Sequence, residues 1–229
     1  MPKKTRGQGC PRSLLESALL LAVNSRLELR QRRPYCPAMT PLLDLPAFRR
    51  RVHPMSVETY HRLGEMGALS EDVELLRGIV VTKMAKSPLH EFVSQVLMKL
   101  LLALLPPGFD VRPERPLTLG DSEPEPDLSV VKGRPHDWVH AHPTTAELVI
   151  EVAVTSVDID EGKAAIYAEA AIPEYWIVQP EERRVIVCRE PTPEGYRSRA
   201  TLTEADTLRC ASLPGVEIAV TALFPPRAM

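Results

Sequence analysis

Cysteine is scarce in this chain of 229 residues, and its longest apolar run is far too short to cross a membrane. The four cysteines, Cys10, Cys36, Cys188 and Cys210, lie far apart and form no C-x-x-C pair. They therefore indicate neither a zinc finger nor a disulfide framework, and the expected location is a reducing cytoplasm. No internal repeat is visible, and no membrane partner is expected.

A strong excess of charge is also lacking, because 28 lysines and arginines are balanced by 30 acids, for a net charge of −2. This balance gives no overall signal for nucleic-acid binding, although a local basic cleft would suffice. The charge is unevenly spread: residues 1–53 hold 11 Lys or Arg and 3 Asp or Glu, or +8, and the remainder carries −10. The basic part and the acidic part are therefore expected to have different roles.

Residues 1–53 are expected to form a basic, poorly ordered N-terminal extension, and residues 54–229 the folded domain. Leu14 to Val23 follows a basic start and could be a short signal-peptide core. Glu16 interrupts that run, however, and no clean small-x-small cleavage site follows it. Whether the extension is translated at all stays open, since an internal methionine could serve as the start.

Helical and strand-like patterns alternate irregularly in the rest of the chain. Ser56 can cap a helix through Leu63 that Gly64 ends, and Ser87-Pro88 can begin a long helix with an apolar stripe from Phe92 to Leu104. A further helix is predicted over Gly162–Ala171, before Pro173. Strands are predicted at Val73–Leu76, Ile79–Val81, Val111–Leu119, Asp127–Val131, Leu148–Val152, Tyr175–Val178 and Val185–Cys188, with weaker candidates at Arg197–Thr201 and Val216–Val220. This order predicts an α/β fold with a mixed central sheet flanked by helices.

An acid lies inside the most apolar of these strands, because Glu151 interrupts Leu148–Val152. A carboxylate buried there loses its hydration and needs a partner, usually a metal ion or a lysine. Asp127 stands at one end of a neighbouring predicted strand, and Lys163 lies in the helix that follows Glu151. Two carboxylates and an ammonium on adjacent elements are suited to metal-assisted phosphodiester cleavage.

Several short motifs occur in an order that carries a family resemblance. They are Val73-Glu74-Leu75, Ser87-Pro88-x-His90, Pro126–Val131, Glu147–Val152, Thr155-Ser156, Lys163-x-x-x-Tyr167-Ala168 and Ile172–Val178. With these motifs, the stretch from about Met55 to Pro225 resembles the Uma-two family of restriction-endonuclease-like proteins. That family belongs to the PD-(D/E)xK nuclease superfamily, so the resemblance implies a restriction-endonuclease-like fold and a nuclease-like site.

The resemblance assigns roles to individual residues. The family's metal-binding aspartate falls on Asp127 and its glutamate on Glu151, and the backbone carbonyl of Val152 is a candidate third ligand. The superfamily often has a lysine two residues after the glutamate, where this chain has Ala153. The family's shifted lysine falls on Lys163 instead.

One motif position departs from the family pattern. The family usually has an aspartate four residues before its lysine, and this chain has Ile159 there, between Asp158 and Asp160. The match between the family pattern and the residues near Lys163 is therefore open by about one position, and so is the local geometry there.

The function expected from these residues is hydrolysis of DNA phosphodiester bonds with Mg²⁺, or with Mn²⁺ as an alternative. Mg²⁺ prefers oxygen ligands and is held by one or two carboxylates. Lys163 could orient the attacking water or neutralise developing negative charge. Glu74, His90 and Tyr167 are auxiliary candidates, Tyr167 because it shares a helix face with Lys163 at i, i+4.

Each assignment has a structural alternative. Asp127 could simply begin a strand, Glu151 could pair with Lys163 for stability alone, and His90 could cap or pack. The whole domain could be a non-catalytic module that binds nucleic acid or a partner protein, and a homodimer is an open alternative. The dense histidines of His136–His142 suggest zinc at first sight, but without a fourth ligand at a recognisable spacing a solvated loop is favoured.

Overall fold

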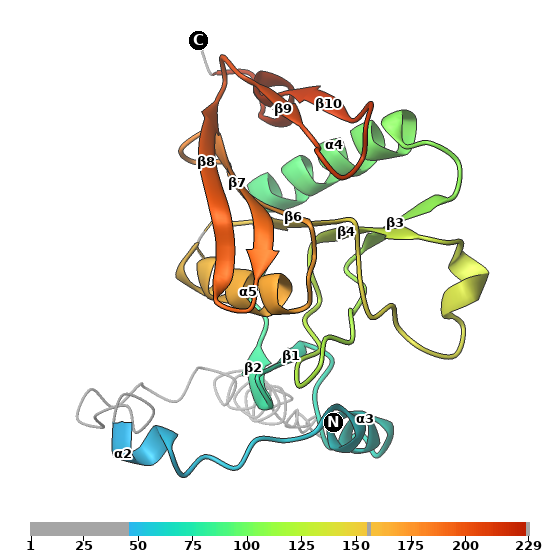
Figure 1. Cartoon of the computed structure of the whole chain (residues 1–229), viewed down its shortest axis with the longest axis vertical. Coiled ribbons are helices and arrows are strands. Elements are labelled where there is room, and N and C mark those ends of the chain that lie inside the picture. The colour runs from blue at the N-terminus through green and yellow to red at the C-terminus, as the bar shows by residue number, and fades with distance from the viewer. Residues whose placement is uncertain (1–45, 155–156, 228–229) are drawn as a thin grey trace, which may run out of the picture. The chain divides into compact units, whose positions relative to one another are not determined.

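The structure is a computed structural model that describes residues 46–154 and 157–227 (Figure 1). The predicted N-terminal extension therefore lies outside the described residues up to residue 45, as do Thr155-Ser156. A short helix, α2 (Pro46–Arg49), belongs to a unit of its own, and the chain from His53 onward forms a second compact unit.

A six-stranded sheet forms the centre of this unit, with the order β3-β4-β5-β6-β7-β8. Its strands are β3 (Phe109–Pro113), β4 (Leu128–Lys132), β5 (Leu148–Val152), β6 (Glu174–Gln179), β7 (Arg184–Thr192) and β8 (Gly195–Thr203). Only β5 and β6 pair in parallel, and the other neighbours are antiparallel. A parallel pair needs a crossover connection, which here contains α5 (Val157–Glu169). The predicted mixed sheet flanked by helices is confirmed.

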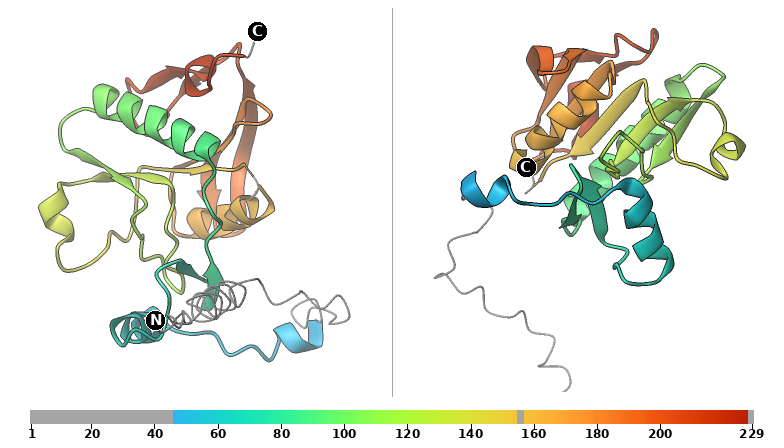
Figure 2. Two further views of the ribbon diagram at one scale, coloured as in Figure 1. Left: turned by 180° about the vertical axis from the view of Figure 1, so that it is seen from behind. Right: turned by 60° about the horizontal axis from the view of Figure 1, so that its bottom comes forward.

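Helices cover the two faces of the sheet, α4 (Pro88–Leu104) on one side and α5 on the other (Figures 1 and 2). Alternation along β5 divides its side chains between the two cores: Ile150 and Val152 pack on the α4 side, and Val149 and Ala153 on the α5 side. Glu151 therefore points toward α5, on the side of the sheet where Val149 and Ala153 are buried.

The C-terminal segment completes the core on the α4 side. Strands β9 (Thr207–Arg209) and β10 (Glu217–Ala219) form a small antiparallel sheet, followed by a 3-10 turn, η3 (Val220–Leu223). Leu208, Ile218 and Leu223 are buried against the same cluster as α4. The weak strand signal at Val216–Val220 thus corresponds to a short strand and a turn.

A separate hairpin joins β1 (Val73–Leu76) to β2 (Ile79–Thr82). Its two turn residues, Arg77 and Gly78, have φ values of 54° and 71°. Positive φ at both positions suits a tight hairpin turn. A β-bridge between Leu75 and Glu123 attaches the hairpin to the segment before β4.

The predicted first residues of α3 and α4 agree with the structure better than the predicted end of α3 does. Ser56 caps α3 (Val57–Glu65) by accepting a hydrogen bond from the Thr59 backbone N–H at 3.2 Å, and Ser87 caps α4 in the same way. Gly64 does not end α3, because an interior glycine is tolerated at a cost of about 1 kcal/mol. The chain turns instead at Gly67, where φ is +68°.

Three predicted boundaries or faces were wrong. Helix α5 begins at Val157 and continues through Gly162 instead of starting there. The edge strand β3 ends at Pro113 rather than at Leu119, because proline cannot donate to the ladder. Phe92 is 42% exposed, so the buried stripe of α4 is narrower than predicted, with Val93, Leu97 and Leu101 at its centre.

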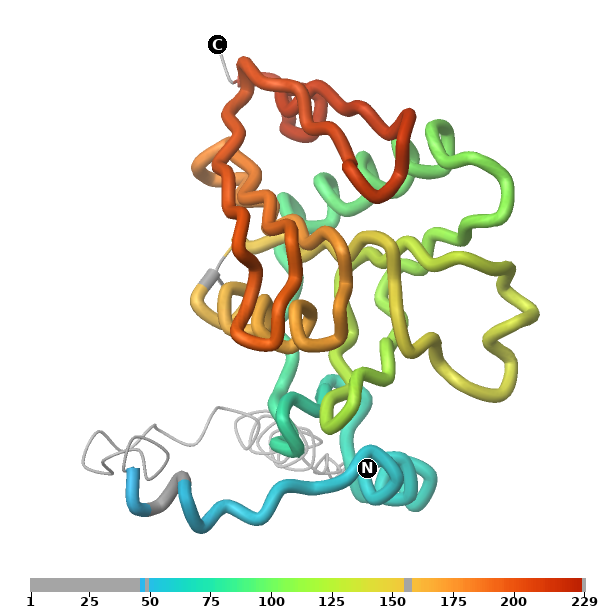
Figure 3. Tube along the Cα trace, viewed as in Figure 1, coloured from blue at the N-terminus to red at the C-terminus, as the bar shows by residue number. Residues whose placement is uncertain are grey.

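A long connection links β4 to β5 and extends away from the sheet (Figure 3). It contains a 3-10 turn, η2 (Pro135–Trp138), and the histidine-rich segment. None of the helices in the described part of the chain is long and apolar enough to span a bilayer.

Candidate active site

The register of two neighbouring strands brings the two predicted carboxylates together. Leu128 of β4 pairs with Ile150 of β5, so Asp127, one residue earlier, lies beside Glu151, one residue later. The Asp127 backbone N–H donates to Glu151 Oε2 at 3.2 Å, and the Val152 backbone N–H donates to Asp127 Oδ2 at 2.8 Å. Main-chain donors thus fix the orientation of both acids.

Helix α5 supplies the lysine and the tyrosine. Lys163 Nζ lies 3.0 Å from Glu151 Oε1, and the Tyr167 hydroxyl donates to the same oxygen at 3.1 Å. Residues at i and i+4 share a helix face, which is why both reach one carboxylate. Because α5 begins at Val157, Lys163 lies within the helix and not at its start.

The hairpin contributes a third acid. Glu74 on β1 accepts from Lys163 Nζ at 2.9 Å through Oε1 and from the Glu125 backbone N–H at 3.1 Å through Oε2. The Lys163 ammonium therefore bridges two carboxylates that come from separate sheets. Side-chain exposure is only 6% for Lys163 and Glu74 and 4% for Glu151, so both ion pairs are buried.

The N-terminal end of α4 and the segment before it contact Asp127 from the other side. His90 Nε2 lies 2.9 Å from Asp127 Oδ2, and Lys86 Nζ lies 3.5 Å from Oδ1. Lys86 also pairs with Glu114 at 2.8 Å. His90 is thus placed as a partner of the predicted metal-binding aspartate.

Most of these side chains line a cavity of about 160 Å³, among them Asp127, Glu151 and Lys163. Lys83 stands in its wall and pairs with Glu125 at 2.9 Å. Asp160 also lines the cavity and is 4% exposed, whereas Ile159 is 45% exposed. The structure thus places Asp160, rather than Ile159, among the buried acids of the site, and Asp160 shares a helix face with Lys163 at i, i+3.

Burial and charge act on the acids in opposite directions. Burial raises the pKa of Asp127, but the hydrogen bonds from His90 and from the Val152 N–H, together with the Lys86 charge, outweigh it and leave the pKa lowered. Burial raises the pKa of Glu151 to about 8; the Lys163 charge opposes this, and the Asp127, Asp160 and Glu74 charges add to it.

The lysine stays charged in the same surroundings. Burial lowers the pKa of Lys163, yet the charges of Glu151 and Glu74 more than compensate, and the net pKa is raised. Lys163 keeps its proton because it has two acidic partners, whereas Glu151 must share that single cation with Glu74. The site is therefore richer in carboxylate than its lysine can neutralise, which favours entry of another cation.

The donor chemistry of the site fits a hard divalent cation. Asp127 and Glu151 offer oxygen ligands, and Mg²⁺ needs only one or two carboxylates besides water. In the described part of the chain, no group of three or more His, Cys, Asp or Glu side chains is arranged to hold a metal by itself. For Val152 the contact seen is made by its N–H, so a ligand role for its carbonyl stays a prediction. The histidines of residues 136–142 likewise form no such group.

Comparison with known proteins shows the family and the fold of the chain. Residues 57–221 match the family described as "Uma2: Putative restriction endonuclease". The chain belongs to the Uma2 family. Among solved structures, this Uma2 protein is similar to "a putative nuclease belonging to DUF820" from Anabaena variabilis, with a TM-score of 0.60 and 15% identity. The likeness covers 74% of this chain and 97% of that one, and it supports the fold. No curated protein matches the chain.

The structure places the residues predicted for this Uma2 site close together, with several others that the sequence had not singled out. The structure brings Asp127, Glu151 and Lys163 together, with Glu74, His90 and Tyr167 in contact with them. Lys83, Lys86 and Glu125 were not singled out. The one sequence feature that could have pointed to these three residues is their position, one to four residues before a motif that carries the family resemblance.

Proposed function

We propose that this Uma2 protein is a Mg²⁺-dependent endonuclease that hydrolyses phosphodiester bonds in DNA. The observation that carries the proposal is the cavity in which Asp127 and Glu151 lie beside the buried ammonium of Lys163. An apolar core excludes such groups unless they are paired, and carboxylates with perturbed pKa values beside a charged partner in a cleft are candidates for a functional site. Mn²⁺ is expected to substitute for Mg²⁺.

Asp127 and Glu151 would hold the metal ion. When bound, Mg²⁺ supplies a Lewis acid that activates water and stabilises charge on the scissile phosphate. His90 and the Val152 N–H hold Asp127 in place, and Tyr167 does the same for Glu151. These contacts hold both carboxylates in place in the lining of the cavity.

The lysines of the cavity act on the substrate. Lys163 would donate to a phosphate oxygen as negative charge develops there, which is the role of an oxyanion-stabilising group. Lys83 and Lys86, which are a quarter to a third exposed, would attract the phosphates that flank the scissile bond. Each of these two lysines already pairs with an acid, so a phosphate would replace or share that partner.

The acidity of residues 54–229 favours one alternative, a module of nuclease fold that binds nucleic acid or a partner protein without cutting. The two functions differ in a single measurement, since both bind but only one produces new DNA ends. Binding without cleavage under every metal condition would support the module.

The test is to incubate purified protein with supercoiled, linear and single-stranded DNA in Mg²⁺, in Mn²⁺ or in EDTA. We expect nicking of supercoiled DNA with either metal and none in EDTA. Asp127→Asn should lower the rate on the order of a hundredfold or more. Asp158→Asn, an exposed acid of α5, is the matched control and should cut at the wild-type rate. Cleavage in EDTA, or wild-type cleavage by Asp127→Asn, would refute the proposal.

A further inference from the structure

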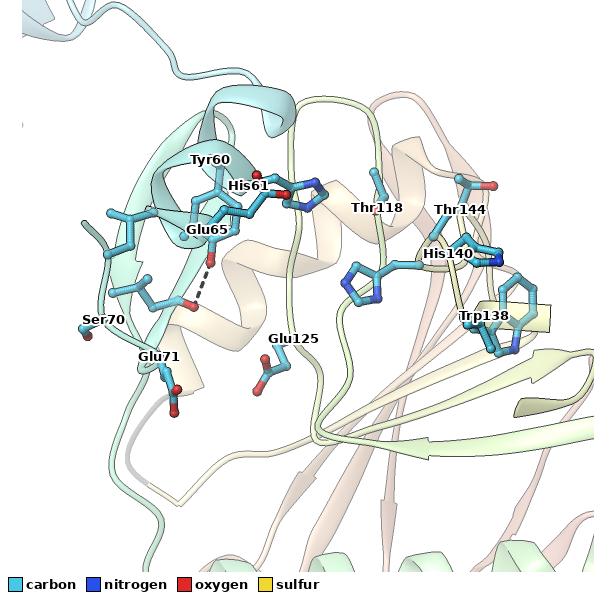
Figure 4. A pocket seen from close by; sticks show the side chains of 16 residues that line it. Tyr60, His61, Glu65, Ser70, Glu71, Thr118, Glu125, Trp138, His140 and Thr144 are labelled. Carbon is cyan, nitrogen blue, oxygen red and sulfur yellow. Dashed lines mark hydrogen bonds between the residues drawn. The ribbon is translucent and has the colours of Figure 1, made fainter. Parts of the chain in front are cut away.

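A second and larger cavity, of about 780 Å³, adjoins the catalytic one (Figure 4). It lies between α3, the segment that leads into β1, and residues 138–144 of the long connection. Its size is within the range of pockets that bind small molecules or single chemical groups of a larger ligand. Glu125 lines both cavities, so they share a wall residue.

Flat rings line this second cavity. Figure 4 shows Trp138 and His140 on one side of it and Tyr60 on the other, with Glu125 between them. The guanidinium of Arg112 lies 5.8 Å from the centroid of the Trp138 ring. Rings of this kind stack on nucleobases regardless of sequence, which contributes about 1–3 kcal/mol for each base. The walls therefore suit a planar aromatic ligand.

The second cavity has no lysine or arginine among its described lining residues. Three acids, Glu65, Glu71 and Glu125, line it together with three histidines. The first cavity is lined by five acids as well, but also by three lysines, including Lys83 and Lys86, so it alone of the two offers ammonium groups to a phosphate. A nucleotide that spans both cavities would thus place its phosphate beside the lysines and its base beside the glutamates. Carboxylates accept hydrogen bonds, so they suit amino groups on a base edge.

We propose that this second cavity is a subsite for one unpaired nucleobase that carries an exocyclic amino group, next to the phosphate that is cleaved. The inference rests on the proposed nuclease function and narrows its substrate to single-stranded or flipped-out DNA. Cytosine and adenine present an amino group, whereas thymine presents a carbonyl and a methyl group at the corresponding edge. A base within a duplex cannot enter a cavity of this kind without leaving the stack.

Binding can be measured without cleavage by keeping the protein in EDTA. The chain has two tryptophans, and Trp176 is fully buried, so a stacked base should quench the fluorescence of Trp138. The probes are an oligothymidylate and the same strand with one thymidine replaced by dC or dA. We expect the substituted strands to bind about tenfold more tightly and to quench more strongly. Equal affinity for all strands would overturn the proposal.

Two variants test the cavity walls separately. Trp138→Leu should abolish the quenching, and the double variant Glu65→Gln with Glu71→Gln should reduce the tenfold preference to nearly none. Glu182→Gln removes an exposed acid from the β6–β7 turn and is the matched control, with the wild-type preference expected. A preference that survives in the double glutamine variant would refute the role of the carboxylates, even if Trp138→Leu fails to fold.

The cleavage assay distinguishes failure of this subsite from failure of the nuclease. If the protein cleaves DNA with metal but binds all strands equally in EDTA, the subsite is refuted and the nuclease function is not. If the protein binds the substituted strands more tightly in EDTA but cleaves no DNA with metal, the nuclease function is refuted and the subsite belongs to a binding module. Preferential cleavage beside dC or dA, lost in the double glutamine variant, is the result expected if both are correct.

Discussion

Replacing Lys163 by methionine probes both the stability of the site and its chemistry. The ammonium lies 3.0 Å from Glu151 and 2.9 Å from Glu74, and all three side chains are almost fully buried. Removing one partner of a buried ion pair costs about 3–5 kcal/mol, because the other charge is left without compensation. Two carboxylates lose their shared partner here, so we expect a loss in the upper half of that range without metal. Methionine keeps the side-chain length and the helix propensity.

The free energy of unfolding should be measured with urea in EDTA over a pH series that extends above the Glu151 pKa of about 8. The Lys163 charge opposes the rise of that pKa, so its removal raises the Glu151 pKa further and the loss of stability should grow as the pH rises. Lys83→Met is the matched control. Lys83 pairs with Glu125 at 2.9 Å, but both side chains are about a quarter exposed, so the expected change is below about 1 kcal/mol. Adding Glu74→Gln to Lys163→Met should recover part of the loss, because one buried charge disappears.

Cleavage should be measured on the same preparation, under conditions in which the variant is folded. We expect the rate to fall on the order of a hundredfold, the usual effect of losing one group that stabilises developing negative charge. An unchanged unfolding free energy in EDTA would refute the reasoning about the buried pairs. Wild-type cleavage by a folded Lys163→Met protein would remove Lys163 from the mechanism.

Four further outcomes are expected. Mg²⁺ or Mn²⁺ should raise the melting temperature, because a metal that binds only the folded state adds RT ln(1 + [L]/Kd) to the free energy of unfolding. A rise in melting temperature that survives in Asp127→Asn and in Glu151→Gln would place the metal elsewhere. Because burial raises the Glu151 pKa from 4.5 to about 8, the folded state binds more protons than the unfolded state between these values. Stability without metal should therefore fall as pH rises from about 5 to about 8, and an equally steep slope in Glu151→Gln would contradict this. A chain beginning at Pro54 should melt at the same temperature as the full chain, whereas a large fall would show that residues 1–53 stabilise the domain. Gly78→Ala should lower the unfolding free energy by about 1–3 kcal/mol, because φ is +71° and the added Cβ would lie 2.5 Å from the Pro54 Cβ; an unchanged value in urea would contradict it.

The sequence was most informative where local signals agreed with one another. Leu148–Val152 is apolar on both faces, and the structure buries all five residues in β5 within the predicted bounds. Ser87 followed by proline correctly predicted the start of α4, because a side-chain acceptor and a fixed φ both favour a helix there. The acid inside β5 pointed to a site, since an acid is stable there only with a partner.

Local signals were insufficient wherever distant segments meet. Nothing near Glu74 in the sequence indicates that its hairpin would lie against α5, so its contact with Lys163 depends on tertiary packing. Asp160 was seen only as a neighbour of the expected aspartate position, because the start of α5 was placed too late to define its face. Phe92 was assigned to the core by its apolar character alone, although it is 42% exposed.

The attachment of Glu74 to a separate hairpin has a consequence for motion. The β1–β2 pair shares no strand pairing with the six-stranded sheet, whereas Asp127 and Glu151 are fixed by that sheet and its edges. Elements with few buried contacts open locally at a lower free energy than the whole domain. Amide protons of the hairpin should therefore exchange with solvent faster than those of β5. Each such opening would release one of the two acids that hold Lys163, while the pair that would bind the metal stays in place.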